Sequence, residues 1–572
     1  MSGPSGCGPA SVAVSGHMVD SPGRDVPRFP PDQVDRVTRE VHAGFDRWQV
    51  GPGTTLVCGG ARGADIIAAE AASARGARVL LRLALPPATL ERRSVELPGT
   101  DWVARFRRLL AIADVEVLPE QATGDGDGDD VFALANDWMI GVARDLSVEP
   151  PHTLVVWDGK SGDGPGGTAD FVRRLGHRGP GPQIMVIDPT RRAYEERQAP
   201  DGQKKVLALD GGGIRGALAI EVLATIESQL RQRYGDKLVL ADYFDYIGGT
   251  STGAVIAAAL AMGSPVGQLR EAYETLGRKV FRKRFFPKRL RSLYRDGPLT
   301  EVLDDMLGDG RTLGDPALRC LLMVVLHNTV TDSPWLLSNC TQAKYNRADR
   351  CLNRPPDRNL DLSLTQVVRG CTAAPLYFPP QEMMVGARPF LFQDGGITPF
   401  NNPALILFLM ATLPEYGLGW PVGDDRLLIV SVGTGSSTAV HPGLLAKQVR
   451  LLFTLRNLPA VFMNGTAVSQ DLLCRALGRC VTGAPIDREV GDRIGAEGVG
   501  NRSLFTYVRY DADLSAESLS DEGISDPRQQ RRLRKLDAVG SLPELQELGQ
   551  RVAQGVRLDE HFHGFLPTPA RT

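Results

Sequence analysis

Two glycine-rich turns, each placed between an apolar run and a helical pattern, constrain the fold of this chain more than any other feature. The first turn, DGGGIRG from Asp210 to Gly216, follows an apolar run at residues 206–209. The second, GTSTG from Gly249 to Gly253, lies between a strand-like run at 243–247 and a run of small residues at 254–260. Buried strand, tight turn and helix in this order are typical of α/β folds. We therefore expect an α/β fold in which the turns supply two parts of one site, an anion cradle and a nucleophile.

The second turn predicts a nucleophilic serine. Ser251 has Gly249 and Gly253 two positions away on each side, which is the spacing of a nucleophile elbow. The glycines allow the tight bend, and the start of the following helix favours negative charge beside the serine. The pattern is short, so a turn built from Gly, Ser and Thr without any chemistry is the alternative interpretation.

The first turn predicts an anion site, because Gly211, Gly212 and Gly213 can direct bare backbone N–H groups at a negative charge. The anion is a phosphate or the oxyanion of an acyl-transfer intermediate. The spacing is not Gly-x-Gly-x-x-Gly, and no Lys-Ser or Lys-Thr follows, which favours the oxyanion. Arg215 either adds positive charge to this site or is structural.

The predicted proton acceptor for the serine is Asp394, in the segment FQDGG. It follows the short apolar segment 389–392 and precedes a glycine turn, so a purely turn-forming aspartate is the alternative. A free aspartate has a pKa of about 3.9, and removal from water would raise it and make the carboxylate a better base. His327 follows an apolar run at 321–326, and we interpret it as a core or strand-end histidine.

These motifs, in this order, resemble those of the patatin-like phospholipases over residues 203–510. The resemblance also rests on the block RGCTAAPLYFPP at 369–380, on Asn401-Asn402-Pro403 after the aspartate, and on LIVSVGTG at 428–435. It implies a patatin-like α/β acyl hydrolase domain in which Ser251 attacks a lipid ester and Asp394 takes its proton. The amides around Gly211, Gly212 and Gly213, with Arg215, would hold the oxyanion. It implies no metal and no cofactor.

Residues 1–190 are predicted to form a separate domain, a doubly wound Rossmann-like sheet. Six short apolar runs alternate with helical patterns, at 11–15, 55–58, 77–83, 115–118, 153–157 and 184–187. In such sheets, ligands bind at the carboxyl ends of the strands. Gly-rich loops follow several of these runs, and tight turns without a ligand are the alternative interpretation.

These loops resemble those of the SLOG superfamily, Rossmann-like domains thought to bind nucleotides or their derivatives. The match rests on SGHMVDSPGR at 15–24, GGARGAD at 59–65 and GGTAD at 166–170. It implies a nucleotide-like ligand, for which the expected binding residues are Gly59, Gly60, Arg62, Gly63, Asp65, Gly166, Gly167 and Thr168.

The remaining segments and the composition bound the possibilities further. We expect a polar linker at 191–202 and a helical extension at 511–572 packed on the catalytic domain. The net charge of −2 indicates no nucleic-acid partner, and the eight scattered cysteines indicate reduced thiols and no zinc site. No apolar run is long enough to span a membrane, and no signal peptide is recognised, so we expect a cytoplasmic protein.

Contact with a membrane is expected to be peripheral, at the inner membrane when the protein is active. From Arg278 to Arg295, lysine and arginine alternate with apolar and aromatic residues, which suits a surface for anionic lipid headgroups. A solvated helix with an apolar inner face is the alternative. The sequence leaves the oligomeric state open, with a homo-oligomer among the alternatives.

Three functions follow from the two resemblances. The leading hypothesis is a lipid acyl hydrolase regulated by a nucleotide-like ligand on the N-terminal domain, as in a bacterial defence or stress effector. The second is a constitutive lipid or small-ester hydrolase with a structural N-terminal domain. The third is a nucleotide-cleaving activity in the N-terminal domain.

Overall fold

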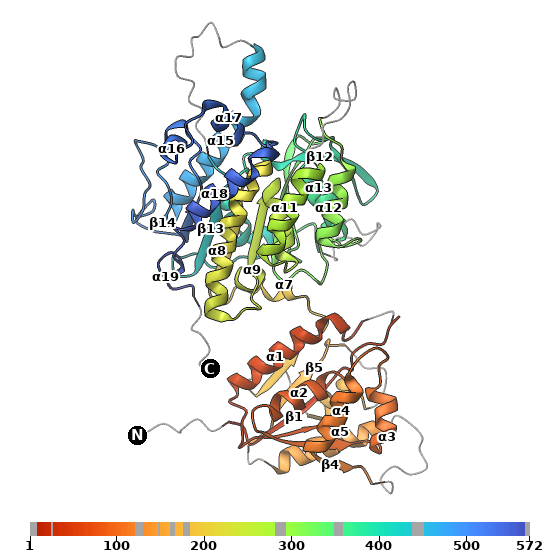
Figure 1. Cartoon of the computed structure of the whole chain (residues 1–572). Helices are drawn as coiled ribbons and strands as arrows, with labels where there is room; N and C mark the ends of the chain where they lie inside the picture. Colours follow the sequence, from red (N-terminus) through yellow and green to blue (C-terminus); the bar gives the residue numbers. More distant parts are fainter. Residues whose placement is uncertain are drawn as a thin grey trace, which may run out of the picture. The chain divides into compact units, whose positions relative to one another are not determined.

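The chain forms two compact units, residues Met1–Arg191 and Arg192–Thr572, each with its own sheet and hydrophobic core (Figure 1). The structure is a computed structural model. It describes residues 8–24, 27–119, 130–146, 149–160, 166–175, 183–280, 293–347, 358–436 and 451–566.

The first unit is a parallel six-stranded sheet flanked by helices, red to orange in Figure 1. Its strands are β1 (Ser11–Gly16), β2 (Thr55–Cys58), β3 (Arg78–Leu83), β4 (Asp114–Val117), β5 (His152–Val156) and β6 (Ile184–Ile187). Its helices are α1 (Val34–Arg47), α2 (Ala64–Ser73), α3 (Pro87–Leu90), α4 (Trp102–Ile112), α5 (Asp130–Asp145) and α6 (Thr168–Leu175). The strand order β4-β3-β2-β1-β5-β6 is that of a doubly wound sheet, so the predicted fold class is confirmed.

The second unit is built on a mixed nine-stranded sheet in the order β11-β12-β9-β8-β7-β13-β15-β14, with β10 paired to β9. Its strands are β7 (Lys204–Leu209), β8 (Tyr246–Thr250), β9 (Leu321–Asn328), β10 (Ser333–Ser338), β11 (Gln381–Val385), β12 (Arg388–Asp394), β13 (Leu427–Val432), β14 (Arg479–Thr482) and β15 (Thr506–Tyr510). Strands β9, β8, β7, β13, β15 and β14 are parallel, whereas β10, β11 and β12 pair antiparallel.

Helices cover this second sheet. They are α7 (Ala193–Glu196), α8 (Gly216–Tyr234), α9 (Leu240–Tyr243), α10 (Thr252–Ala261), α11 (Val266–Val280), α12 (Gly297–Leu307), α13 (Leu364–Cys371), α14 (Ala404–Thr412), α15 (Leu451–Leu477), α16 (Ala516–Asp521), α17 (Pro527–Leu533), α18 (Leu542–Ala553) and α19 (Leu558–His561). The predicted strand at 243–247 lies slightly early, because Tyr243 ends α9 and the strand β8 begins at Tyr246.

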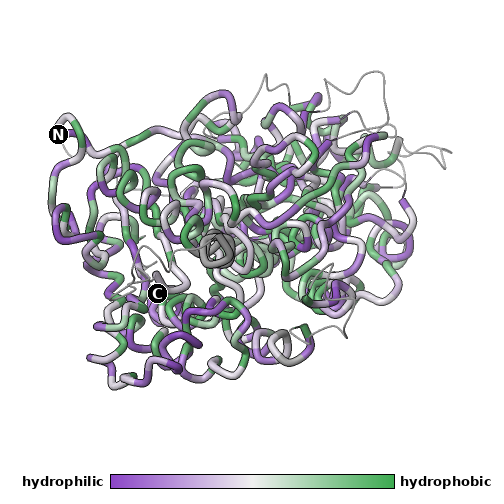
Figure 2. Tube along the Cα trace, turned by 90° about the horizontal axis from the view of Figure 1, so that it is seen from above, coloured by the Kyte–Doolittle hydropathy of each residue, from purple (hydrophilic) through white to green (hydrophobic). Residues whose placement is uncertain are grey.

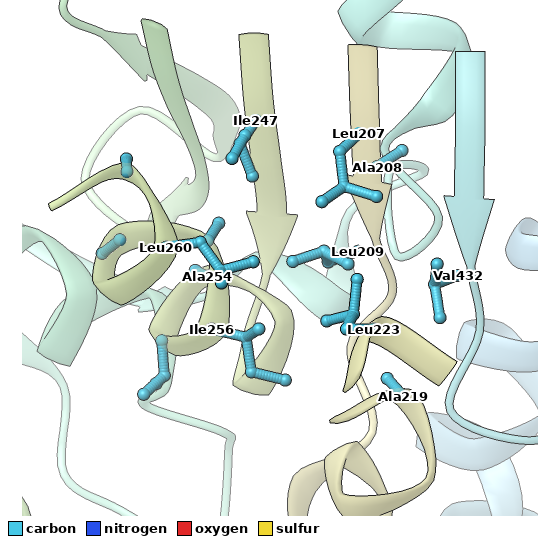
Figure 3. Packing of buried hydrophobic residues seen from close by; sticks show 14 of the residues in the cluster. Leu207, Ala208, Leu209, Ala219, Leu223, Ile247, Ala254, Ile256, Leu260 and Val432 are labelled. Carbon is cyan, nitrogen blue, oxygen red and sulfur yellow. The ribbon is translucent and has the colours of Figure 1, made fainter. Parts of the chain in front are cut away.

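The two glycine turns lie side by side because β7 and β8 are adjacent parallel strands. Both strands are buried on both faces, as expected of central parallel strands, and α8 and α10 pack on them. Figure 3 shows this core, with side chains from Leu207, Ala208, Leu209, Ala219, Leu223, Ile247, Ala254, Ile256, Leu260 and Val432.

Helices α12 and α18 have one buried and one solvated face, whereas α10 is buried along its whole length. Figure 2 shows hydrophobic residues in green and hydrophilic residues in purple interspersed along the chain trace. Within the part of the chain that the structure describes, no helix is long and apolar enough to cross a membrane.

The segment expected as a linker, 191–202, packs on the second unit. Tyr194 is fully buried in that core, and its hydroxyl donates to the carbonyl of Gly314 at 3.1 Å. The indole N–H of Trp420 also donates a hydrogen bond to the backbone carbonyl of Gln198. The second unit therefore begins at Arg192, and this stretch is part of its structure rather than a free connection.

Candidate active site

Ser251 occupies a sharp turn between β8 and α10. Its backbone has φ 54° and ψ −123°, a strained conformation for a non-glycine residue that is found at functional sites. A Cβ on Gly249 would lie 2.1 Å from the Gly253 carbonyl oxygen, and one on Gly253 would lie 2.3 Å from that of Leu209. Both flanking positions therefore require glycine, and the geometry is that of a nucleophile elbow.

Asp394 faces this serine. The Ser251 hydroxyl donates to Asp394 Oδ2 at 2.7 Å, although the residues are far apart in sequence. The contact follows from strand register, because Thr250 pairs with Val325 on one side of β9 and Asp394 pairs with Leu326 on the other. The serine and the aspartate thus come together because their strands pair with consecutive residues of β9, Val325 and Leu326.

The Asp394 carboxylate is buried and hydrogen-bonded at both oxygens. Its Oδ1 accepts the N–H of Gly396 at 2.7 Å, so this residue also forms the turn that the alternative interpretation predicts. Burial raises the pKa of Asp394 to about 6, although hydrogen bonds from Ser251 and Gly396 oppose the shift. A carboxylate with this pKa is a stronger base than a solvated one and is still ionised at neutral pH.

The glycine loop is close to the serine, but only part of it can bind an oxyanion. The N–H of Gly211 already donates to the carbonyl of Asn401 at 3.1 Å, so this residue does not take the predicted role. Among the hydrogen bonds of the described residues, none has the N–H of Gly212 or Gly213 as donor. Gly213 has φ 59° and lines the cavity beside Ser251. Gly212 and Gly213 therefore remain the candidate oxyanion donors.

The predicted role of Arg215 in the oxyanion site is also corrected. Its guanidinium donates to the carbonyls of Gly435 at 3.0 Å and Gly212 at 3.4 Å, and it does not line the cavity. Arg215 therefore ties the glycine loop to the turn after β13.

A buried ion pair behind the loop was not predicted. Arg509 donates to both carboxylate oxygens of Asp210, at 3.0 and 2.6 Å, and to Asp511 at 2.7 Å. Asp511 in turn accepts the N–H of Gly435 at 2.8 Å. These contacts hold the start of the glycine loop on β15, and nothing in the local sequence around Arg509 indicated them.

Ser251 and Asp394 lie in an apolar cavity of about 90 Å³ in the second unit. Its lining is mainly aliphatic and aromatic, and no histidine is found among the described residues that form it. The lining residues are Gly213, Ser251, Thr252, Val255, Tyr273, Val280, Leu299, Thr372, Ala374, Pro375, Tyr377, Phe378, Asp394, Gly396, Ile397, Met463 and Leu536. His327 instead pairs with Asp332 at 3.2 Å on the β9–β10 hairpin.

Two further residues at this site were missed. Cys371, inside the block at 369–380, accepts the N–H of Ser251 at its sulfur at 2.9 Å. Leu536 lies in the C-terminal extension, accepts the N–H of Ile214 at its carbonyl at 2.8 Å, and lines the cavity. The first could have been suspected from its motif, whereas only tertiary packing brings Leu536 to the site.

The first unit has a separate cavity of about 400 Å³ at the carboxyl ends of its strands. Of the expected ligand residues, Gly59, Asp65, Gly166, Gly167 and Thr168 line it. Burial raises the pKa of Asp65 to about 7, against the effect of the hydrogen bonds it accepts from the 59–61 backbone.

The other three expected ligand residues, Gly60, Arg62 and Gly63, have structural roles. Arg62 is buried, and it donates to the carbonyls of Val19 and Glu96 at 2.9 and 3.3 Å, which braces neighbouring loops. Gly60 and Gly63 have positive φ and pack tightly, so they are turn formers. Four arginines line the cavity in place of Arg62, namely Arg24, Arg28, Arg82 and Arg93.

A histidine–aspartate pair marks the switch point of this first sheet. Strand β1 pairs with β2 on one side and β5 on the other, and ligands of open α/β sheets bind at such a point. His17 follows β1, Asp158 follows β5, and His17 Nε2 is 2.9 Å from Asp158 Oδ1. Burial lowers the pKa of His17, although the hydrogen bond to Asp158 opposes this.

Comparison with known proteins supports the sequence resemblance in the second unit. The family model for patatin-like phospholipases matches residues 207–408. Patatin-like protein 1 of Arabidopsis thaliana is 31% identical over 41% of this chain and 59% of its own length. Two proteins named cGAMP-activated phospholipase are also similar. The one from Vibrio cholerae is 28% identical over 56% of this chain and 84% of its length, and the one from Escherichia coli is 29% identical over 43% and 66%.

These matches confirm a patatin-like phospholipase domain at residues 207–408. The chain spans only 59% of the length of the Arabidopsis relative. The resemblance of the N-terminal unit to the SLOG superfamily stays a prediction.

Proposed function

We propose that the second unit is a lipid acyl hydrolase in which Ser251 is the nucleophile and Asp394 its only proton acceptor. The observation that carries this proposal is the 2.7 Å hydrogen bond from the Ser251 hydroxyl to the buried Asp394 carboxylate. The patatin-like match at 207–408 and the phospholipase names of the relatives support a lipid ester as the substrate.

In the proposed reaction, Ser251 Oγ attacks the ester carbonyl carbon while its proton passes to Asp394 Oδ2. The carbonyl oxygen becomes negative, and the N–H groups of Gly212 and Gly213 and the start of α10 stabilise it. Collapse of this intermediate breaks the bond to the alcohol, which leaves with the proton from Asp394. Water, activated by the same carboxylate, then releases the fatty acid and restores Ser251. The apolar cavity suits the acyl chain.

The decisive experiment measures hydrolysis of a short soluble ester and of phospholipid vesicles by the intact protein and by Ser251→Ala. We expect the variant to lose at least 10³-fold in turnover and to keep its melting temperature. Retention of activity in the folded variant contradicts the proposal.

We further propose that a nucleotide-like ligand in the first unit's cavity regulates this activity. Four arginines and the Gly166–Gly167 backbone around the cavity suit phosphate groups, and two relatives are named for activation by cGAMP. A ligand switches activity only if it binds the active state more tightly than the inactive one. Cyclic dinucleotides, mononucleotides and nucleotide sugars should therefore be compared as activators, with hydrolysis as the readout.

A pair of neighbouring arginines gives a matched control for this ligand site. Arg93 lines the cavity, whereas Arg92, which is also exposed, does not. We expect Arg93→Ala to weaken the ligand response and Arg92→Ala to leave it intact. Equal responses in both variants would remove the cavity from the regulatory proposal.

The His17–Asp158 pair favours a second candidate function, cleavage of the nucleotide-like ligand in the first unit. Such a pair can act as a general base in a cavity of this kind. Incubation of the intact protein and of His17→Ala with the same nucleotide panel tests it. This candidate is excluded if the intact protein leaves the nucleotides unchanged. If no ligand alters the turnover of the ester, a constitutive hydrolase is favoured instead.

As for location, we propose a cytoplasmic protein that contacts the inner membrane peripherally when active.

A further inference from the structure

The backbone N–H groups of Ser251 and Asp394 are both bound by one short segment at the end of α13. The N–H of Ser251 donates to the sulfur of Cys371 at 2.9 Å. The N–H of Asp394 donates to the carbonyl of Ala373 at 3.1 Å. The two acceptors belong to residues that are two positions apart, so a short stretch of backbone fixes their separation. We name residues 371–373 the clamp.

The Cys371 side chain contacts the backbone on both sides of the reacting pair. Its sulfur also interacts with the backbone N–H of Gly395, the residue after Asp394. The side chain is fully buried, and burial raises the pKa of its thiol well above that of a solvated cysteine. Cys371 is therefore a neutral hydrogen-bond acceptor, which does not repel the Asp394 carboxylate.

The clamp is itself held in place by α13 and β9. The N–H of Thr372 donates to the carbonyl of Val368 at 3.1 Å, and that of Ala373 donates to the carbonyl of Gly370 at 3.2 Å. A Cβ on Gly370 would lie 3.0 Å from Leu326 Cδ2, so α13 packs closely on β9. The clamp therefore rests on the same strand whose consecutive residues align the strands of the serine and the aspartate.

The Ser251 backbone requires a partner of this kind. Its φ of 54° is strained for a non-glycine residue, and such a conformation persists only where the surrounding structure fixes it. Ser251 precedes the first turn of α10, so its N–H has no acceptor within that helix. The Cys371 sulfur supplies the acceptor. The 2.7 Å hydrogen bond from Ser251 Oγ to Asp394 depends on the backbone orientation that this contact fixes.

We propose that Cys371 is a positioning residue, which acts with the Ala373 carbonyl to hold Ser251 Oγ against the Asp394 carboxylate. The inference rests on the proposed hydrolase function. Cys371 is not among the described residues that line the cavity, so it acts on the reacting pair rather than on the substrate. Loss of its sulfur should therefore lower kcat and leave KM unchanged.

The test compares two variants of the intact protein with a short soluble ester as the substrate. Cys371→Ala removes the acceptor, and we expect kcat to fall on the order of 10-fold, because small displacements of a reacting group are costly. Cys371→Ser supplies an oxygen that can accept the Ser251 N–H, so it should keep most of the turnover. An equal loss in both variants, or a loss that appears only in KM, overturns the proposal.

The pH profile gives a readout that a purely structural cysteine would not change. The hydrogen bond from Ser251 lowers the pKa of Asp394, against the effect of burial. Without the clamp this bond weakens, so the pKa rises and the acidic limb of kcat/KM moves up by roughly half a pH unit. The titratable group that faces Asp394 from α13 is the Cys371 thiol, which is neutral in this pH range, so its removal changes no charge. An unmoved limb in Cys371→Ala overturns the proposal.

Cys320 provides a matched control. It is also fully buried, and among the hydrogen bonds of the described residues none involves its sulfur. Cys320→Ala should lower the melting temperature about as much as Cys371→Ala, but leave kcat and the acidic limb unchanged. The same kinetic change in both variants would show a general packing defect and overturn the proposal.

A measurement without turnover separates this proposal from the proposed function. The pH at which Asp394→Asn and its parent begin to differ in melting temperature reports the pKa of Asp394, because only the parent titrates there. That pH should be higher when both proteins also carry Cys371→Ala, and an identical pH overturns the role of the clamp. If the unmodified protein hydrolyses no ester, the hydrolase function fails, while this comparison still decides the clamp.

Discussion

At the scale of single residues, the site depends on one buried carboxylate. In many serine hydrolases a histidine separates the serine from the carboxylate, whereas here Ser251 donates directly to Asp394. If Asp394 is the base, as we propose, its ability to accept a proton decides the pH range of activity. Its burial in an apolar cavity brings the pKa to about 6, within reach of physiological pH.

We predict that kcat/KM for a soluble ester falls about tenfold per pH unit below pH 6, because protonated Asp394 cannot accept the Ser251 proton. A pH–rate profile measures this directly. A profile flat down to pH 4.5 would show that Asp394 is not the base.

The same shift predicts how stability changes with pH. The folded-state pKa is raised from 3.8, so the carboxyl's favourable contribution is fully present below pH 3.8 and lost as the pH rises through about 6. Asp394→Asn should therefore be inactive and melt at a higher temperature than the unmodified protein at pH 8. At pH 4 the two melting temperatures should approach each other.

The elbow glycines give a third prediction at residue scale. A Cβ at Gly253 would meet the backbone carbonyls of Leu209 and Asp210 at 2.3 and 2.7 Å, which cannot move without displacing β7. Gly253→Ala should cost at least about 2 kcal/mol of unfolding free energy and abolish hydrolysis. Gly267→Ala, in α11 with no atom near the new methyl group, is the control and should leave hydrolysis unchanged without lowering the unfolding free energy. Denaturant unfolding and ester hydrolysis measure the pair.

At the scale of elements, the C-terminal extension forms part of the cavity that contains Ser251 and Asp394. Helix α18 packs along α8 (Figure 1), close enough that a Cβ on Gly549 would meet the Leu218 carbonyl at 2.7 Å. The loop between α17 and α18 brings Leu536 to the cavity, and Asp537 beside it accepts the Tyr294 hydroxyl at 2.7 Å. A segment beyond the family match therefore supports both the glycine loop and the cavity beside Ser251.

We predict that Leu536→Ala shifts acyl-chain preference. Removal of this side chain enlarges the cavity, so kcat/KM for a long-chain ester relative to butyrate should rise about 10-fold or more. Val539→Ala, in the same loop but packed against Gly277 of α11, is the matched control and should keep the original ratio. An unchanged ratio in an active Leu536→Ala protein would exclude Leu536 as a wall of the acyl site.

At the scale of the whole molecule, the two units have separate cores and separate cavities. The boundary between the units, at Arg191 and Arg192, decides where a fragment of the chain should begin, because Tyr194 is buried in the second core. A fragment of residues 192–572 should fold and hydrolyse soluble esters without any response to nucleotides. A fragment beginning at residue 203 should be less stable by about 3 kcal/mol or more, since it lacks this aromatic side chain. Thermal unfolding of the two fragments measures the difference.

The sequence alone predicted the α/β class, the strands of the first sheet and β7 and β8 of the second within a few residues, and Ser251 and Asp394 as the two side chains that meet. It did not predict β10, β11, β14 or β15. The predicted features are local or carried by short motifs, because apolar runs, glycine turns and helical periodicity report on nearby backbone. Tertiary structure decided what each polar group does. The Gly211 N–H is taken by Asn401, Arg215 and Arg62 brace loops, and Arg509 and Leu536 reach the site from β15 and the C-terminal extension. A hydrogen-bonding group has one set of partners in the fold, and only the register of distant strands and helices determines which partners those are.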